Sequence, residues 1–283
     1  MAIPKLLKSL RISEKQSINV KNTKIPDGAW WHTAYGNGTY IAANGDDEPL
    51  IIYSKDGNTW FKGTGFEDAP SHDGCFEVAG YGDGVFIAAA STSFYRSENG
   101  VNWTKVTVES VSGDPIGGDD VTLAYGNGTF VMVGSPITCV CVSKDKGLSW
   151  QYYPVLDGSS SIRGWGCIFS NTRNKFIFID RDNYRLLEST DGITWTIAGD
   201  LGITKSAYNM IEFNGKLILS SSSALLTYDA STLSLIHQED LINDDGNAKY
   251  RNFTIYNNAV YVTRWLTDGF QYLYRSYDGI AWE

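Results

Sequence analysis

Short segments rich in apolar residues alternate with polar, glycine-rich turns along most of the chain. In the first unit of this pattern the apolar segments are 31–35, 40–43, 50–53 and 60–62. Segments of this length that follow one another through tight turns are typical of antiparallel strands joined as a meander. Later stretches repeat the order of strand, glycine-rich hairpin, strand, variable loop, strand, second hairpin and strand. The pattern predicts an all-β protein built from four-stranded antiparallel units.

The second hairpin of each unit carries a recurring motif, which we call the Ser–Asp hairpin. Its longest form, Ser-Lys-Asp-Lys-Gly-Leu-Ser-Trp, lies at 143–150, with shorter forms at 54–60, 97–103, 189–195 and 276–282 and a copy without tryptophan at 228–234. In such a turn Ser and Asp bond to nearby backbone, glycine supplies a positive φ angle, and tryptophan packs beneath. We therefore expect a structural role for Ser54, Asp56, Trp60, Ser143, Asp145, Gly147, Trp150, Ser189, Asp191, Trp195, Ser276, Asp278 and Trp282.

The first hairpin of each unit follows an aromatic residue, and we call it the aromatic hairpin. The aromatic residues lie 46, 44, 44, 44 and 43 residues apart, at Tyr35, Tyr81, Tyr125, Phe169, Phe213 and Tyr256. This period is typical of four-stranded propeller blades. The sequence predicts a six-bladed β-propeller over 28–283, with both kinds of hairpin on one rim. The remaining loops vary most and lie on the opposite rim, where we expect the function.

The Ser-x-Asp-x-Gly-x-Ser/Thr-Trp pattern, complete at 143–150, resembles the Asp-box or BNR repeat of sialidase-like β-propellers. The resemblance covers nearly all of 28–283, and it implies the fold rather than an activity, because the box is structural and non-catalytic members are common. The shortened Asp-Gly-x-x-Trp form, with a Tyr-Gly-Asn-Gly hairpin upstream, looks like propellers of bacteriophage tail and other virion proteins. The resemblance thus implies a non-catalytic binding or structural module of a virion, associated with the tail.

A glycoside hydrolase of the sialidase type is the first alternative. That family implies three arginines around the substrate carboxylate, a Tyr–Glu nucleophile pair, an acid Asp and a Phe/Tyr-Arg-Ile-Pro segment that opens the first blade. Here the segment at 26–31 reads Pro-Asp-Gly-Ala-Trp-Trp and has no arginine. We therefore expect no enzyme activity. A cytoplasmic assembly factor or protein-interaction scaffold is the second alternative.

Residues 1–27 stand outside the repeat and form a basic N-terminal arm. Residues 1–26 carry six basic residues and one acidic residue, a net charge of +5, which leaves −14 on the rest of a chain whose total is −9. The segment 16–22 alternates as a strand would, and the last Ser–Asp hairpin is followed only by Glu283, so we expect the arm to close blade six. We also expect it to dock other virion proteins, and a frayed terminus is the alternative.

Charge and hydropathy restrict the classes of partner that we expect the chain to bind. The acidic body disfavours nucleic acid, because phosphate binding needs a cationic surface. No apolar run is long enough for a membrane helix, and no secretion signal is evident, so we expect synthesis in the host cytoplasm and a place in the virion. Virion proteins, a host-surface glycan or receptor, and further copies of the chain remain as expected partners.

Aromatic residues outside the hairpins supply the candidate ligand site. They lie near the starts of inner strands or in variable-rim loops, with arginines close by in the sequence. A flat ring beside hydrogen-bonding groups suits sugar or protein recognition. The alternatives are that the rings plug the channel or pack between blades and that the arginines are scattered over the surface. The candidates are Trp30, Trp31, Arg163, Trp165, Arg251, Arg264 and Trp265.

We expect no cofactor and no metal. The three histidines, His32, His72 and His237, are isolated in the sequence. The four cysteines show no zinc or redox spacing, so they read as buried free thiols. Acidic clusters at 45–48, 118–120 and 243–247 read as solvated loops, with Ca²⁺ ligation as the alternative.

Overall fold

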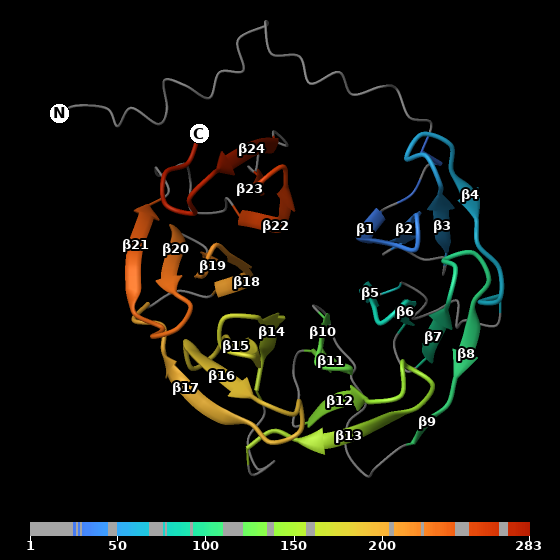
Figure 1. The fold of residues 1–283 in the computed structure, drawn as a ribbon, viewed down its shortest axis with the longest axis horizontal. Helices are drawn as coiled ribbons and strands as arrows, with labels where there is room; N and C mark the ends of the chain where they lie inside the picture. The colour runs from blue at the N-terminus through green and yellow to red at the C-terminus, as the bar shows by residue number, and fades with distance from the viewer. Residues whose placement is uncertain are drawn as a thin grey trace, which may run out of the picture.

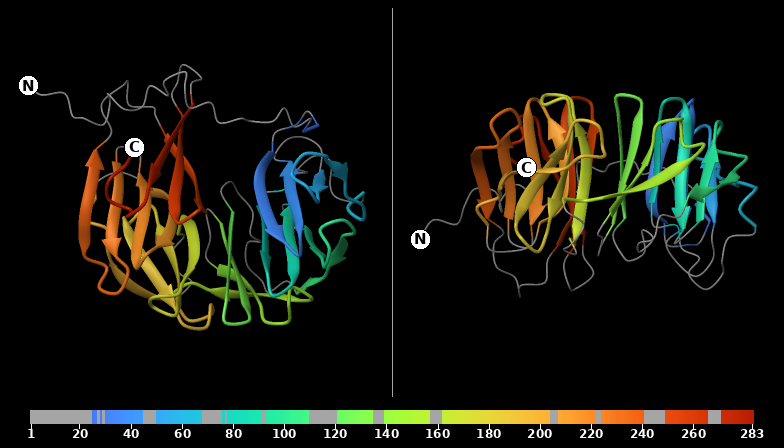
Figure 2. Two further views of the ribbon diagram at one scale, coloured as in Figure 1. Left: turned by 45° about the horizontal axis from the view of Figure 1, so that its top comes forward. Right: turned by 90° about the horizontal axis from the view of Figure 1, so that it is seen from below.

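The computed structural model describes residues 25–26, 28, 30–44, 50–67, 76, 78–90, 93–109, 121–134, 139–156, 162–203, 207–221, 224–240, 249–265 and 271–283. The described strands form six sheets arranged as blades around a central axis (Figure 1). Seen from the side, the blades stand upright with their strands roughly along this axis (Figure 2). The predicted all-β, six-bladed propeller is confirmed.

The blades are numbered in chain order and have the following strands. Blade 1 contains β1 (Trp30–Gly36), β2 (Thr39–Asn44), β3 (Ile51–Ser54) and β4 (Phe61–Lys62). Blade 2 contains β5 (Val78–Gly82), β6 (Val85–Ala90), β7 (Ser93–Ser97) and β8 (Thr104–Val106). Blade 3 contains β10 (Thr122–Gly126), β11 (Thr129–Val133), β12 (Cys139–Ser143) and β13 (Trp150–Pro154), with β9 (Val108–Glu109) on its outer edge.

Blade 4 contains β14 (Gly164–Ser170), β15 (Lys175–Asp180), β16 (Arg185–Ser189) and β17 (Thr196–Asp200). Blade 5 contains β18 (Ala207–Phe213), β19 (Lys216–Ser221), β20 (Ala224–Asp229) and β21 (Leu235–Asp240). The described part of blade 6 contains β22 (Lys249–Tyr256), β23 (Ala259–Trp265) and β24 (Gln271–Ser276).

Within each blade, consecutive strands pair antiparallel from the innermost strand outward, as the turn pattern predicts. The innermost strands β1, β5, β10, β14, β18 and β22 surround the axis (Figure 1). The chain then links neighbouring blades at their outer edges. β9 leaves blade 2 and runs parallel to β13, and Thr64 makes a parallel bridge with Asn102.

The outer edge of blade 6 is partly occupied by the chain itself. The backbone N–H of Arg275 donates to the carbonyl of Glu283 at 2.8 Å, and the N–H of Glu283 donates back at 2.9 Å. Glu283 therefore pairs at the position where a fourth strand lies in the other blades. The predicted closing strand at 16–22 lies outside the described residues.

The buried apolar side chains of the described residues form five clusters, one at each junction between consecutive blades from blade 1 to blade 6. In four of the junctions the tryptophan of a Ser–Asp hairpin packs against the preceding blade. These residues are Trp103, Trp150, Trp195 and Trp282, and all are buried. The hairpin tryptophan thus acts between blades as well as beneath its own turn.

The Ser–Asp hairpins form by the predicted bonds. The Ser54 hydroxyl accepts the N–H of Gly57 at 2.8 Å, and the Asp56 carboxylate accepts the N–H groups of Asn58 and Thr59, each at 2.8 Å. Gly57 has a φ angle of 71°, which only glycine adopts without strain. The same bonds recur in the hairpins of blades 3, 4 and 6.

Two hairpins depart from the motif. In blade 2 Asn99 replaces the aspartate, and its side-chain oxygen accepts the N–H groups of Val101 and Asn102 at 2.8 and 2.9 Å. In blade 5 Asp229 keeps its role, but Thr227 stands at the serine position and donates to the carbonyl of Gly279 in blade 6 at 2.6 Å. The fifth hairpin thus exchanges a bond within the turn for a bond between blades.

Candidate functional site

The aromatic hairpins show how one blade sits on the next. In the first three junctions an aromatic ring of the following blade covers a glycine of the preceding blade, so no β-carbon could be accommodated there. The pairs are Tyr81 over Gly36, Tyr125 over Gly82 and Phe169 over Gly126, where an added β-carbon would lie 2.2, 2.3 and 2.0 Å from the ring. At the junction of blades 4 and 5, Glu212 replaces the ring and accepts the N–H and hydroxyl of Thr172 at 3.0 and 2.6 Å.

Blade 1 lacks this contact, because blades 6 and 1 stand apart. Figure 1 and the tilted view in Figure 2 both show the ring open between β22 to β24 and β1. The Tyr35 ring is 58% exposed and rests on Tyr40 of its own blade, with ring centroids 4.4 Å apart. Trp60 is only partly buried, unlike its counterparts in four other Ser–Asp hairpins.

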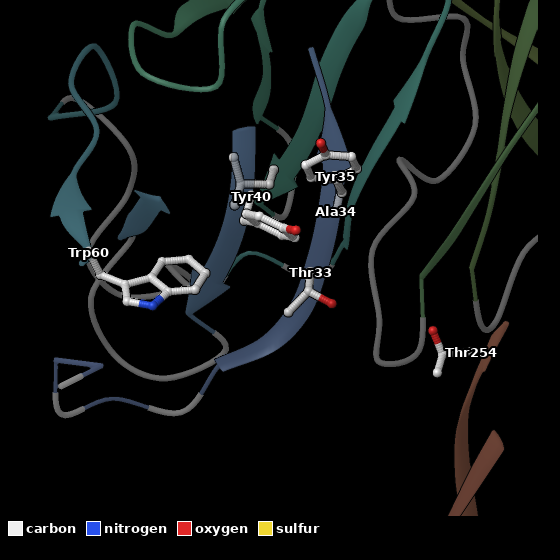
Figure 3. A pocket seen from close by; sticks show the side chains of 7 residues that line it. Thr33, Ala34, Tyr35, Tyr40, Trp60 and Thr254 are labelled. Atoms are coloured by element: carbon white, nitrogen blue, oxygen red, sulfur yellow. The ribbon is translucent and has the colours of Figure 1, made fainter. Parts of the chain in front are cut away.

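A cleft of about 410 Å³ lies at this open side (Figure 3). We call it the seam cleft, and its walls come from blade 1 except for one residue of β22. It is lined by Thr33, Ala34, Tyr35, Tyr40, Ile41, Trp60 and Thr254. Three aromatic rings, two threonine side chains and two alkyl side chains therefore line the cleft, and none of the described residues that line it is charged. Such a surface suits apolar groups with a few hydrogen bonds at the margin.

The seven predicted site residues lie at one end of their blades, the end opposite the hairpins. Residue 30 pairs with 44, 164 with 180, and 249 with 265, which places all seven near the variable rim of blades 1, 4 or 6. Blades 1 and 6 flank the open side, whereas blade 4 lies across the ring (Figure 1). The backbone therefore gathers two of the three groups around the seam.

Trp31 is the predicted residue that presents its ring most clearly. Its side chain is 58% exposed, and it lies two residues before Thr33 in a bulge of β1. The neighbouring Trp30 is half-buried and donates its indole N–H to the carbonyl of Pro26 at 2.9 Å. Trp31 therefore extends the exposed aromatic surface beside the seam cleft.

Trp165 packs between blades 4 and 5. It is 7% exposed, its ring lies 4.9 Å from that of Tyr208, and the guanidinium of Arg181 lies 4.4 Å above it. Its ring offers little surface to a ligand, because it is packed inside the junction between blades 4 and 5. Arg163 is exposed and pairs with Asp182 at 3.5 Å.

The remaining predicted residues are placed by their backbone alone. Arg251 pairs with Thr263 across β22 and β23, Arg264 lies opposite Tyr250, and Trp265 lies opposite Lys249. The three acidic clusters and the residues Cys75 and His72 lie outside the described residues.

Burial is the main influence on the pKa of the titratable groups near the core. Burial lowers the pKa of His32 to about 4 and raises the pKa of the Cys141 and Cys167 thiols. Cys139, Cys141 and Cys167 are buried, and none of these three takes part in a disulfide bond. Among the described residues no group of three or more His, Cys, Asp or Glu side chains is placed to hold a metal ion. None of the described residues forms a helix of the length and apolarity that crossing a membrane requires.

Sequence reasoning missed Tyr35 and Tyr40 as exposed residues. The sequence places Tyr35 in its hairpin alone, because the same residue type recurs in every early unit. The available signal was the position of blade 1 in the chain. Because blade 1 comes first, the side that would pack against a preceding blade faces the open side of the ring instead.

Comparisons with known proteins bear on the fold. No protein-family model matches the chain, and no curated protein matches it. YCF48 from Cyanidioschyzon merolae superposes with a TM-score of 0.63 at 14% identity, over 92% of this chain and 86% of that one. A streptogramin B lyase gives 0.67 at 11%, over 88% and 84%. The GH74 xyloglucanase from Xanthomonas campestris gives 0.69 at 14%, over 92% of this chain and 46% of that one.

At these identities the likeness shows the fold alone. The neighbours include a protein solved with a bound peptide, YCF48 with the D1 peptide, as well as a lyase and a xyloglucanase. The chain is therefore similar to β-propellers with both binding and catalytic roles.

Proposed function

We propose that this chain is a non-catalytic binding module that holds a partner protein in the seam cleft. The observation that carries the proposal is the exposed aromatic surface of blade 1, because the aromatic residues at the same position in blades 2, 3 and 4 pack against the preceding blade. Large exposed apolar surfaces on a soluble protein mark interaction sites. Tyr and Trp are also the residues that most often dominate binding energy at protein interfaces.

The chemistry of the cleft favours a protein segment over a sugar. A sugar presents hydroxyl groups that need several fixed polar partners, and such sites place charged or amide side chains among the rings. Besides its three rings and two alkyl groups, the seam cleft offers threonine and tyrosine hydroxyls and the indole N–H of Trp60, but none of the described residues that line it has a charged or amide side chain. Apolar side chains of a protein segment fit this lining better.

A non-catalytic role is consistent with the state of the hairpin aspartates. Backbone N–H groups of Thr59 and Asn58 hold the pKa of Asp56 at about 2, and bonds from the Ser231 hydroxyl and the Thr232 backbone do the same for Asp229. A carboxylate held so firmly in its charged form is a poor general acid. These groups support the turns.

We place the module in a bacteriophage virion, in the tail. The support is the recurrence of the Ser–Asp and aromatic hairpins around a ring, together with an acidic body and a basic arm that suit docking between subunits. Gold-labelled antibody against this chain should mark the tail of particles whose genome encodes it. Label on the head, or none on purified particles, would contradict this placement.

The binding function can be tested with a displayed library of random linear peptides. We expect the full chain to enrich peptides with apolar and aromatic residues, and the double variant Tyr35→Ala, Tyr40→Ala to lose them. Tyr277→Ala is the matched control, since Tyr277 is also exposed, at 54%, but lies on the hairpin rim of blade 6. Its variant should bind as the parent does.

Two results would overturn the proposal. Binding on a glycan array that the cleft variant abolishes would make the partner a sugar. Release of sugar from a sialoside by the purified chain would make the protein a hydrolase.

A further inference from the structure

We infer that residues 1–24 of this chain bind in the seam cleft when no partner is present, so that a partner must displace them. The second half of this statement rests on the function proposed above. The first half concerns the chain alone and can be tested without any partner.

Position is the first argument. The chain enters blade 1 at Trp30, whose indole N–H is bonded to the carbonyl of Pro26, so the residues just before β1 are held at the start of that strand. β1 is the strand that carries Thr33 and Tyr35 into the cleft. Residues 1–24 span up to about 80 Å when extended, far more than the seam requires.

Side-chain pattern is the second argument. In the alternating segment 16–22, Ile18 and Val20 are two residues apart, and in an extended chain they share one face. The cleft presents Tyr35, Tyr40 and Trp60 to such a face. Burying an aliphatic side chain against these rings removes apolar surface from water, and the tether raises the local concentration of the segment, so both effects favour binding in the cleft.

Charge is the third argument. Residues 1–26 carry a net charge of +5, and the rest of the chain carries −14. None of the described residues that line the cleft is charged, so the lysines of the segment can remain in water around its margin while the apolar side chains are buried. Attraction between the two parts then keeps the segment near the ring at low and moderate salt.

The outer edge of blade 6 is the alternative site for the same segment, and the chain itself already fills one position of that edge. Its position beside Arg275 is filled by the backbone of Glu283, through bonds of 2.8 and 2.9 Å. The aromatic wall of the seam cleft has no comparable cover among the described residues. The cleft therefore offers the segment an uncovered aromatic surface, whereas the edge of blade 6 offers it a strand that is already paired at one position.

Photo-crosslinking in the full chain tests the inference. The probe, p-benzoyl-phenylalanine, replaces Tyr40 in the cleft and, as a matched control, Tyr277 on the hairpin rim. A tethered segment acts at an effective concentration on the order of 1 mM, so we expect peptides from residues 1–24 to dominate the products at position 40 and to be about tenfold rarer at position 277. Mixing isotope-labelled and unlabelled chains separates links within one chain from links between chains.

The charge variant Lys15→Glu, Lys21→Glu, Lys24→Glu should lower the yield at position 40 severalfold and strengthen binding of the library-selected peptides. Products without residues 1–24, or products formed only between chains, would overturn the inference; the latter would make a second copy the occupant. Crosslinks to residues 1–24 without any selected peptide would retain the inference and remove the proposed function.

Discussion

The carboxylate of Asp56 makes the stability of its hairpin depend on pH. Two backbone N–H groups bond to its charged form, which lowers the pKa from 3.8 to about 2. Because the folded pKa lies below the unfolded one, this contribution to stability is complete above about pH 4 and is lost as the pH falls through about 2. We expect Asp56→Asn to flatten that part of the stability profile, as measured by urea unfolding. Asn99, which makes the same bonds without a charge, indicates that the turn still forms.

Position 82 requires glycine because of a neighbouring ring and not because of its own backbone conformation. Its φ angle is not in the left-handed region, but an added β-carbon would lie 2.3 Å from the Tyr125 ring. We expect Gly82→Ala to lower the free energy of unfolding by about 1–3 kcal/mol, the usual effect of overpacking. Gly199→Ala is the control, since no atom lies within 4 Å of its added β-carbon. Equal stability of the two variants in thermal unfolding would show that Tyr125 moves aside freely.

At the scale of the strand and hairpin, the tryptophans of the Ser–Asp hairpins should differ in energy according to their junction. Trp103 is buried in the cluster between blades 1 and 2, whereas Trp60 faces the open side. We expect Trp103→Ala to lower the free energy of unfolding by about 3–5 kcal/mol and Trp60→Ala by clearly less, because less of its surface is removed from water. Urea unfolding measures both. A loss for Trp60→Ala as large as for Trp103→Ala would mean that a full blade-sized surface covers the seam.

The repeat predicts these elements well, because spacing, turn residues and strand length are local. It does not predict how the aromatic residue is positioned relative to the turn in the last two blades. Counted from the turn residues with positive φ, Phe213 and Tyr256 stand where blades 1 to 3 have the glycine. Phe213 packs toward blade 6, and Tyr256 remains exposed. The residue types of the motif alone do not reveal this shift of one position.

The candidate site was harder to predict for a related reason. Trp31 and Trp165 look alike in the sequence, as tryptophans near the starts of inner strands. One is exposed beside the seam and the other fills a junction, and the difference depends on which blade lies opposite. Burial at a blade surface is set by a non-local neighbour, which the residue's own segment does not encode.

At the scale of the whole molecule, the open side divides the blades into two classes. Blades 2 to 5 are each packed between two neighbours, whereas the described residues of blades 1 and 6 form an apolar cluster on one side only. A blade with one packed face loses fewer contacts when it opens, so its local opening requires less free energy. We therefore expect amide hydrogen exchange to be faster in β2 and β23 than in β11 and β15.

The same measurement distinguishes an empty seam from one filled by residues 1–24. If that segment covers the cleft, the charge variant Lys15→Glu, Lys21→Glu, Lys24→Glu should speed exchange in β2 of blade 1 and leave β11 and β15 unchanged, because only the cleft loses its cover. Unchanged exchange in β2 would mean that the segment contributes nothing to blade 1. Equal protection in all six blades of the parent chain would instead mean that blades 1 and 6 meet in solution, since only a closed ring gives every blade two packed faces.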